Sequence, residues 1–243
     1  MAFEILNILR LTSNLSALIF MIFIWIIIHK TLSYTKLTKE ERWKFSILTL
    51  TGLVFWYSLV YFLGRNGFFS RNPLFAPGIL IGFLIIFEIL RRVYFSQKIR
   101  SVTDLIPQHW IILVQFYRIV GYEFIALYHQ GLLPAAFAYS AGIGDMIIGF
   151  SAPIVALLYY LKKPYSKKLA VVWNILGIID LALAIGIGFV GFPRPVQFVP
   201  LTPSTEQLSL IPLVLVPLFA VPLAILLHLF SLRTILKKDK KNK

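Results

Sequence analysis

The chain has 243 residues, of which 58% are hydrophobic, 15% are aromatic and none is cysteine. A soluble domain is about 45–50% apolar, so this composition excludes an ordinary water-soluble protein and predicts an integral membrane protein. The lack of cysteine excludes disulfides and thiolate metal sites. We attribute the net charge of +14 to membrane topology and to attraction for anionic lipid at the inner face, and not to nucleic acid.

Seven apolar segments are long enough to cross a bilayer, each near the ~20 residues that a spanning helix needs. We therefore predict an all-α, polytopic membrane protein, a bundle of seven transmembrane helices that forms a single domain over residues 1–243. The spans are predicted at about 11–29, 45–64, 74–93, 107–129, 133–160, 169–191 and 208–232.

Lysine and arginine are distributed unequally between the two sides of these spans. Nineteen of the 24 lie in the alternate connections 30–44, 91–104 and 162–168 or in the basic tail 233–243. The positive-inside rule then places the N-terminus outside and the C-terminus, with its tail, in the cytoplasm. We expect the membrane to be the cytoplasmic (inner) membrane of a bacterium.

The fourth span carries polar residues at membrane depth on an otherwise apolar helix. At about 100° per residue, four of them fall on one stripe, within roughly 80° of one another. Glu123 lies well off this stripe, toward the outer side. Its carboxyl is either a gate or proton-relay group or a protonated acid bonded to a tyrosine. The residues of the stripe are Gln115, Arg118, Tyr122 and His129.

The fifth span combines a row of small residues with one carboxylate. Gly142 and Gly149 share a face with Asp145, and small residues let two membrane helices approach closely. A carboxylate on such a face needs a partner. We predict that Asp145 forms a buried ion pair with Arg118, or belongs to a network that includes this pair.

The sixth span repeats the pattern near mid-depth, with Asp180 on the same face as Gly177. Together with Arg118, Asp145 and Gln115, it predicts a cluster of polar side chains from three helices. In the functional interpretation, the cluster is a substrate or proton site. In the structural interpretation, it is a polar clasp that holds the bundle together. The sequence leaves both open.

The seventh span contains Pro212, Pro217 and Pro222. Each proline lacks a backbone donor and disturbs the carbonyl four residues earlier. The result is either a broken helix that lines a transport path or a kinked packing helix. His228 follows near the inner end. The four histidines lack i,i+3 or i,i+4 spacing, so we predict neither a metal site nor a cofactor.

The first functional hypothesis is a transporter or permeation protein for a small solute, with proton coupling as one version. Arg118 would bind an anionic group or hold the resting pair, and Asp145 or Asp180 would exchange a proton. The alternative is a membrane-embedded enzyme acting on a lipid or isoprenoid, with Glu123, Asp145 and His129 as acid–base groups. A third is a sensor or assembly subunit. An enzyme is the less favoured class, and the sequence indicates neither the substrate nor the oligomeric state.

Overall fold

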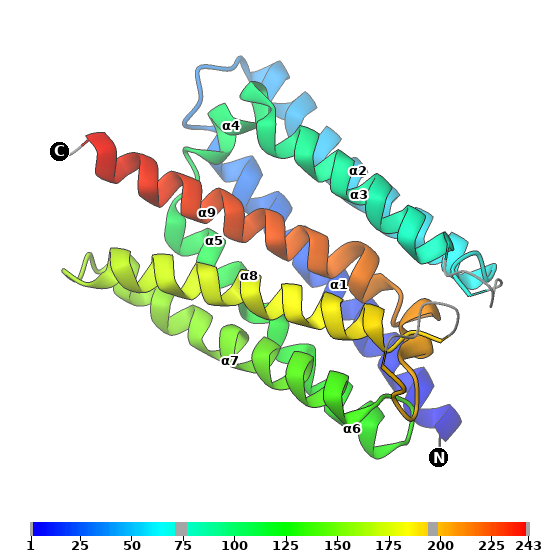
Figure 1. Cartoon of the computed structure of the whole chain (residues 1–243). Coiled ribbons are helices and arrows are strands. Elements are labelled where there is room, and N and C mark those ends of the chain that lie inside the picture. Colours follow the sequence, from blue (N-terminus) through cyan, green and yellow to red (C-terminus); the bar gives the residue numbers. More distant parts are fainter. Residues whose placement is uncertain (1, 71–76, 194–198, 242–243) are drawn as a thin grey trace.

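The protein folds as a bundle of long helices, seen here in a computed structural model (Figure 1). Every regular element among the described residues is a helix, which confirms the predicted all-α class. The structure describes residues 2–70, 77–193 and 199–241, without the side chains of 2–10, 77–78, 80 and 238–241.

Six stretches of the described residues are long and apolar enough to cross a membrane, which indicates an integral membrane protein. They correspond to six of the predicted spans. The predicted third span, 74–93, overlaps α3 but begins outside the described residues, so the count of seven stays a prediction. The elements are α1 (Ala2–Leu32), α2 (Lys39–Arg65), α3 (Pro77–Phe95), α4 (Gln97–Thr103), α5 (Gln108–Val114), η1 (Gln115–Gly121), α6 (Tyr122–His129), α7 (Ala135–Tyr160), α8 (Ser166–Val190), η2 (Thr205–Ser209), η3 (Val216–Ala220) and α9 (Val221–Lys241).

The fourth predicted span, 107–129, forms one rod from Gln108 to His129, but the rod is not α-helical throughout. Its middle part, η1, is a 3₁₀-helix that separates α5 from α6. A 3₁₀-helix turns by about 120° per residue, against about 100° in an α-helix. Residues that follow η1 are therefore rotated by roughly a third of a turn from the positions that an α-helix would give them.

The last span begins later than the predicted 208–232. After η2 the chain turns, and the helix starts with the π-helical segment η3, which continues directly into α9. Proline has no N–H to bond the preceding turn, so the predicted proline disturbance takes the form of a late start and a π-helical first turn. At its other end α9 reaches Lys241 and includes most of the predicted basic tail, 233–243.

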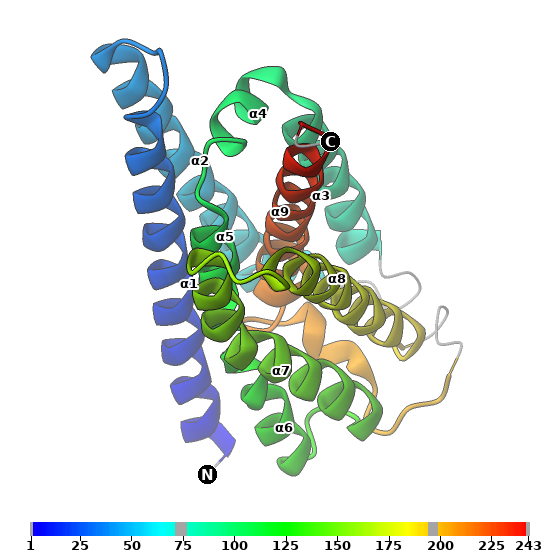
Figure 2. The ribbon, with the colours of Figure 1, turned by 90° about the vertical axis from the view of Figure 1, so that its left-hand side faces the viewer.

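The core is formed by the rod α5–η1–α6 together with α7, α8 and α9. The buried share of the most apolar window is 67% in the last span, 50% in the rod, 39% in α7 and 28% in α8, against 22% in α1 and 11% in α2. The central helix is α9, which contacts α3, α5 and α8 (Figure 1). Figure 2 shows α1 and α2 side by side along one edge of the bundle.

Candidate functional site

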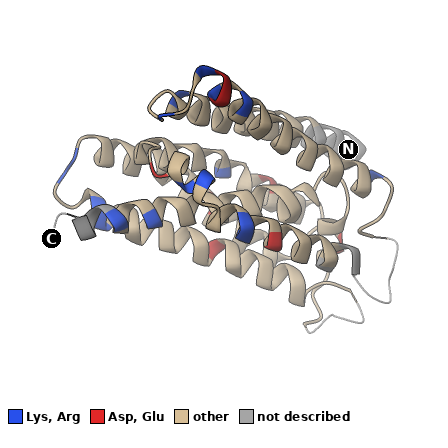
Figure 3. Ribbon diagram, turned by 90° about the horizontal axis from the view of Figure 1, so that it is seen from above, with Lys and Arg blue, Asp and Glu red and all other residues tan. Residues whose placement is uncertain are grey.

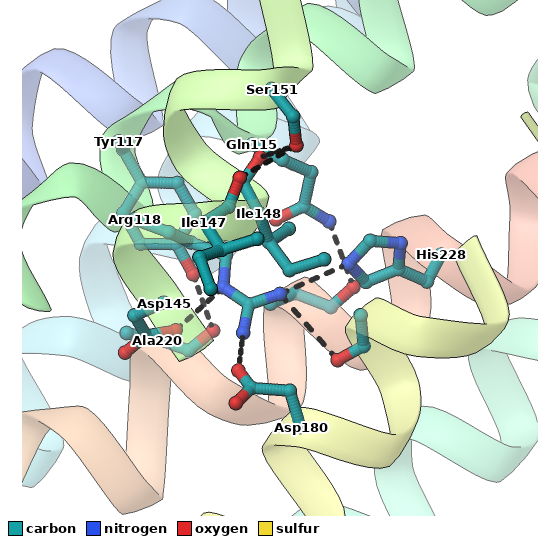
Figure 4. A network of polar contacts seen from close by, with 12 residues as sticks. Gln115, Tyr117, Arg118, Asp145, Ile147, Ile148, Ser151, Asp180, Ala220 and His228 are labelled. Atoms are coloured by element: carbon teal, nitrogen blue, oxygen red, sulfur yellow. Dashed lines mark hydrogen bonds and ion pairs between the residues drawn. The ribbon is translucent and has the colours of Figure 1, made fainter. Parts of the chain in front are cut away.

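Arg118, on η1, lies at the centre of a buried polar cluster (Figure 4). Its side chain is 1% exposed, and its Nε donates a hydrogen bond of 2.6 Å to Asp145 Oδ1 on α7. Its Nη2 donates to Asp180 Oδ2 on α8. The predicted pair of Arg118 and Asp145 is confirmed, and Asp180 extends it into a network. One guanidinium therefore joins carboxylates from two different helices.

The remaining guanidinium nitrogen of Arg118 points toward α8 and α9. Nη1 lies 3.5 Å from the carbonyl oxygen of Gly177 and 3.3 Å from Nε2 of His228. A guanidinium nitrogen can only donate, so His228 Nε2 accepts and its proton resides on Nδ1. Nδ1 then donates to Asn174 Oδ1 at 2.9 Å, and Asn174 Nδ2 donates to Ser231 Oγ at 3.0 Å. His228 is thus neutral and joins α9 to α8.

His228 and Asn174 are not among the residues that the sequence predicts for this cluster. Both side chains are fully buried, with 0% exposure. The available signal was that each is an uncharged polar residue within an apolar span, where it requires a hydrogen-bond partner. That signal does not name the partner, because it does not say which face of α9 meets which face of α8.

Glycines bring α7 against η1 beside the cluster. A Cβ added to Gly149 would lie 2.6 Å from the backbone nitrogen of Ile119, and one added to Gly142 would lie 2.8 Å from the carbonyl oxygen of Gly121. Neither backbone atom can yield without moving the helix. Gly142 and Gly149 thus lie where α7 approaches the backbone of η1 closely.

Two further glycines make room for the side chains of the cluster itself. A Cβ on Gly177 would lie 2.5 Å from Cε1 and Nε2 of His228. A Cβ on Gly144 would overlap the carboxylate of Asp180. Small residues therefore create the space that holds the histidine and the aspartate next to Arg118.

Only part of the predicted stripe on the fourth span reaches the cluster. Gln115 is buried and donates to the carbonyl oxygen of Ala224 on α9 at 3.1 Å, while its Oε1 has no partner among the described residues. Tyr122 is 51% exposed, and His129 is exposed at the end of α6. Both follow η1, whose 3₁₀ rotation turns them away from Arg118. The four-residue stripe is therefore interrupted.

Glu123 forms a separate contact between α6 and α1. Its carboxylate accepts hydrogen bonds from Thr12 Oγ1 at 2.7 Å and Ser13 Oγ at 3.2 Å. Two hydroxyl groups of α1 take the place of the tyrosine that one sequence interpretation assigned to it. Glu123 is buried but is not part of the Arg118 cluster.

An apolar pocket of about 400 Å³ lies beside the cluster, between α3, α7 and α8. Among the described residues that line it, Asp145 alone carries a charge. Leu84 and Phe87 of α3 stand at its edge and are 69% and 70% exposed. The edge of the pocket is therefore apolar, as a surface that faces lipid would be. Asp145 belongs both to the pocket and to the ion cluster.

Residues 75–236, two thirds of the chain, match the family described as Domain of unknown function (DUF8737). The chain belongs to this family. No curated protein and no solved structure matches it. The family segment includes Arg118, Asp145, Asp180 and His228, and hence the whole ion cluster, whereas α1 and α2 precede it.

Proposed function

We propose that this protein is a transporter or permeation protein for a small, mostly apolar solute, coupled to protons through the Arg118 cluster. The observation that carries the proposal is that Asp145 belongs both to the ion cluster and to the lining of the pocket. Its carboxylate pairs with Arg118 at 2.6 Å and also lines the pocket of about 400 Å³. A solute in the pocket would therefore touch a group whose charge is balanced by the cluster.

The charges of the cluster support proton exchange. Asp145 and Asp180 face the single guanidinium of Arg118, so two ionised carboxylates would leave one negative charge uncompensated at membrane depth. If either aspartate takes up one proton, the net charge of the cluster becomes zero. Occupation of the pocket changes the surroundings of Asp145 and so shifts the balance between the two protonation states. The solute and the proton are coupled in this way.

The orientation that we propose is N-terminus outside and C-terminus in the cytoplasm, with seven spans including α3. Figure 3 supports it, because lysine and arginine gather toward the end of the bundle where the C-terminus lies. An excess of basic residues on one side is the signature of the cytoplasmic face. We place the protein in a bacterial inner membrane, with anionic lipid as the partner of its basic face.

Flux through reconstituted protein tests the proposal. Liposomes that contain the protein and a trapped pH-sensitive dye receive a panel of small apolar and amphiphilic solutes from outside. We expect at least one solute to change the internal pH, and Asp145→Asn to abolish this response. The matched control is Glu88→Gln, because Glu88 pairs with Arg91 and Arg92 on the surface of α3. Absence of any response, with Asp145→Asn equal to wild type in solute uptake, would refute the proposal.

The apolar edge of the pocket also favours a second candidate, an enzyme whose lipid or isoprenoid substrate enters from the bilayer. The three acid–base groups expected for it do not meet, however. Asp145 is paired with Arg118, Glu123 bonds to α1, and His129 is exposed. A lipid extract that changes chemically on incubation with the purified protein would favour the enzyme over the transporter.

A further inference from the structure

A second and larger cavity lies on the opposite side of α9. It has a volume of about 750 Å³ and is enclosed by α1, α2, α3, α4, α5 and α9. Such a volume is within the range of about 300–1,000 Å³ that is typical of small-molecule sites. The described residues that line it are aliphatic or aromatic over most of its length, and its charged residues are Glu41, Lys44 and Lys98. The cavity is therefore apolar with charge at one end.

The cavity is a groove that runs along α2. It extends from Glu41 to Leu59 on that helix, which corresponds to about 27 Å at 1.5 Å per residue. One half of the hydrocarbon layer of a bilayer is roughly 15 Å thick, so the groove can hold an extended acyl chain. Leu48 and Phe55 at its edge are 71% and 67% exposed, and the groove therefore opens toward the membrane.

The charged end of the groove carries two ammonium groups and one carboxylate, and hence a net single positive charge. Glu41 is engaged in the cap of α2, where its Oε2 accepts the backbone N–H of Thr38 at 2.8 Å. Lys44 pairs with Glu40 at 2.6 Å, but both side chains are more than 70% exposed, and such surface pairs contribute little. Lys98 reaches the same end from α4, which lies at the end of the bundle that also holds the α1–α2 connection and the C-terminus (Figure 2). Two ammonium groups thus stand at the end of an apolar groove.

We propose that this groove binds one phospholipid with an anionic headgroup. The phosphate contacts Lys44 and Lys98, and an acyl chain lies along α2 toward Leu59. Charge and shape both support this occupant, because the groove is apolar where an acyl chain would lie and basic where the headgroup would lie. The site does not depend on the proposed transport, since α9 separates it from the Arg118 cluster.

The first test fills the groove. Gly52 lines it, and a Cβ on Gly52 would have no atom within 4 Å, so Gly52→Trp places a large ring in the groove without a backbone clash. Gly186 of α8 has the same free surroundings outside the groove, and Gly186→Trp is the matched control. Each protein is incorporated into nanodiscs of phosphatidylglycerol and phosphatidylcholine in equal amounts, and the lipids retained are counted by native mass spectrometry.

We expect wild type and Gly186→Trp to retain one phosphatidylglycerol molecule and Gly52→Trp to lose it. Equal retention by the two tryptophan variants would overturn the proposal. Gel filtration and the midpoint of thermal unfolding are measured for both variants, so that a loss of lipid can be distinguished from a loss of structure.

The second test removes the charge and keeps the groove. In Lys44→Gln/Lys98→Gln the ratio of retained phosphatidylglycerol to phosphatidylcholine should fall by about fivefold for each lysine, the order of the attraction between one basic side chain and anionic lipid. The control is Lys163→Gln/Lys168→Gln, which removes two exposed lysines, one in the connection between α7 and α8 and one in the first turn of α8. An unchanged ratio, or the same fall in the control, would overturn the assignment of the headgroup site.

Discussion

The imidazole of His228 accepts a hydrogen bond from the guanidinium of Arg118, with 3.3 Å between Nε2 and Nη1. Its other nitrogen donates to Asn174 on α8. One neutral histidine therefore connects α9 with the carboxylates that α7 and α8 contribute to the cluster. The π-helical segment η3 continues directly into α9. The helix that follows η3 therefore carries His228, one member of the ion cluster.

Replacement of His228 by leucine should destabilise the fold. His228→Leu leaves a guanidinium N–H and the Oδ1 of Asn174 without partners in a buried site, at a cost of about 1–3 kcal/mol for each group. The free energy of unfolding can be measured by titrating the protein in detergent micelles with SDS. His129→Leu is the control, because His129 is exposed. An equal loss of stability in both variants would contradict the assigned role of His228.

Removal of Arg118 alone should be more damaging than removal of the whole cluster. Arg118→Met leaves Asp145 and Asp180 facing each other without a cation, and loss of one partner of a buried ion pair costs about 3–5 kcal/mol. The triple variant Arg118→Met/Asp145→Leu/Asp180→Leu has no buried charge at this position. We expect it to recover most of the free energy of unfolding, because well-packed apolar residues often replace buried ion pairs without loss.

The same triple variant separates the two interpretations of the cluster. If the cluster is a functional site, the variant is folded but carries no solute-linked proton flux in liposomes. If the cluster is only a clasp between helices, the folded triple variant retains the flux of the wild type. Arg92→Met, at an exposed position that pairs with Glu88, controls for the loss of an arginine.

A methyl group at Gly149 should be poorly tolerated. Its Cβ would lie 2.6 Å from the backbone nitrogen of Ile119, so α7 must move away from η1. Forcing extra volume into a packed interface costs about 1–3 kcal/mol. Gly186→Ala provides the control, since no atom lies within 4 Å of the added Cβ. Comparable unfolding midpoints for Gly149→Ala and Gly186→Ala would contradict the close packing of α7 on η1.

The indole of Trp56 compensates for a proline in α9. Pro222 has no N–H for the carbonyl of Leu218 four residues earlier, and Trp56 Nε1 donates to that carbonyl at 3.0 Å. Trp56→Phe should therefore cost about 1–3 kcal/mol of unfolding free energy. The cost should shrink in a Pro222→Ala background, where the backbone supplies the missing donor.

Trp25→Phe is the matched control for this prediction. Trp25 Nε1 is buried and has no hydrogen-bond partner among the described residues, so its loss removes ring volume but no hydrogen bond. One contrary result is that Trp56→Phe lowers the free energy of unfolding only as much as Trp25→Phe does, and another is that Pro222→Ala leaves the effect of Trp56→Phe unchanged. Either result would show that the hydrogen bond from the indole to the carbonyl of Leu218 does not stabilise the fold.

Thiol labelling can establish whether water reaches the pocket beside Asp145. The chain has no cysteine, so a single cysteine gives an unambiguous signal. Ala184 lines the pocket, whereas Ala170 is 0% exposed and lies outside it. We expect a membrane-impermeant maleimide to label Ala184→Cys in the folded protein and to label Ala170→Cys only after unfolding in SDS. An Ala184→Cys as unreactive as Ala170→Cys would count against a solvent-connected pocket.

The pairing of Arg118 with Asp145 was predictable because an ionised group inside a membrane has few ways to be stabilised. An arginine and a carboxylate on neighbouring apolar spans almost require each other. The partners of His228 and Gln115 were not predictable in the same way. Uncharged polar groups can bond to any nearby carbonyl or side chain, so their partners depend on the faces that the helices turn toward one another.

The sequence by itself determined that the chain is helical and apolar enough for a membrane, and which charged residues lie within the spans. These properties follow from residue type, because the cost of exposing an apolar or charged side chain is set locally. The tertiary structure decided which residues meet. The 3₁₀ segment η1 turned Tyr122 and His129 away, and the packing of α9 against α8 placed His228 beside Arg118. Such outcomes depend on accumulated helix rotation and on contacts between residues far apart in the chain.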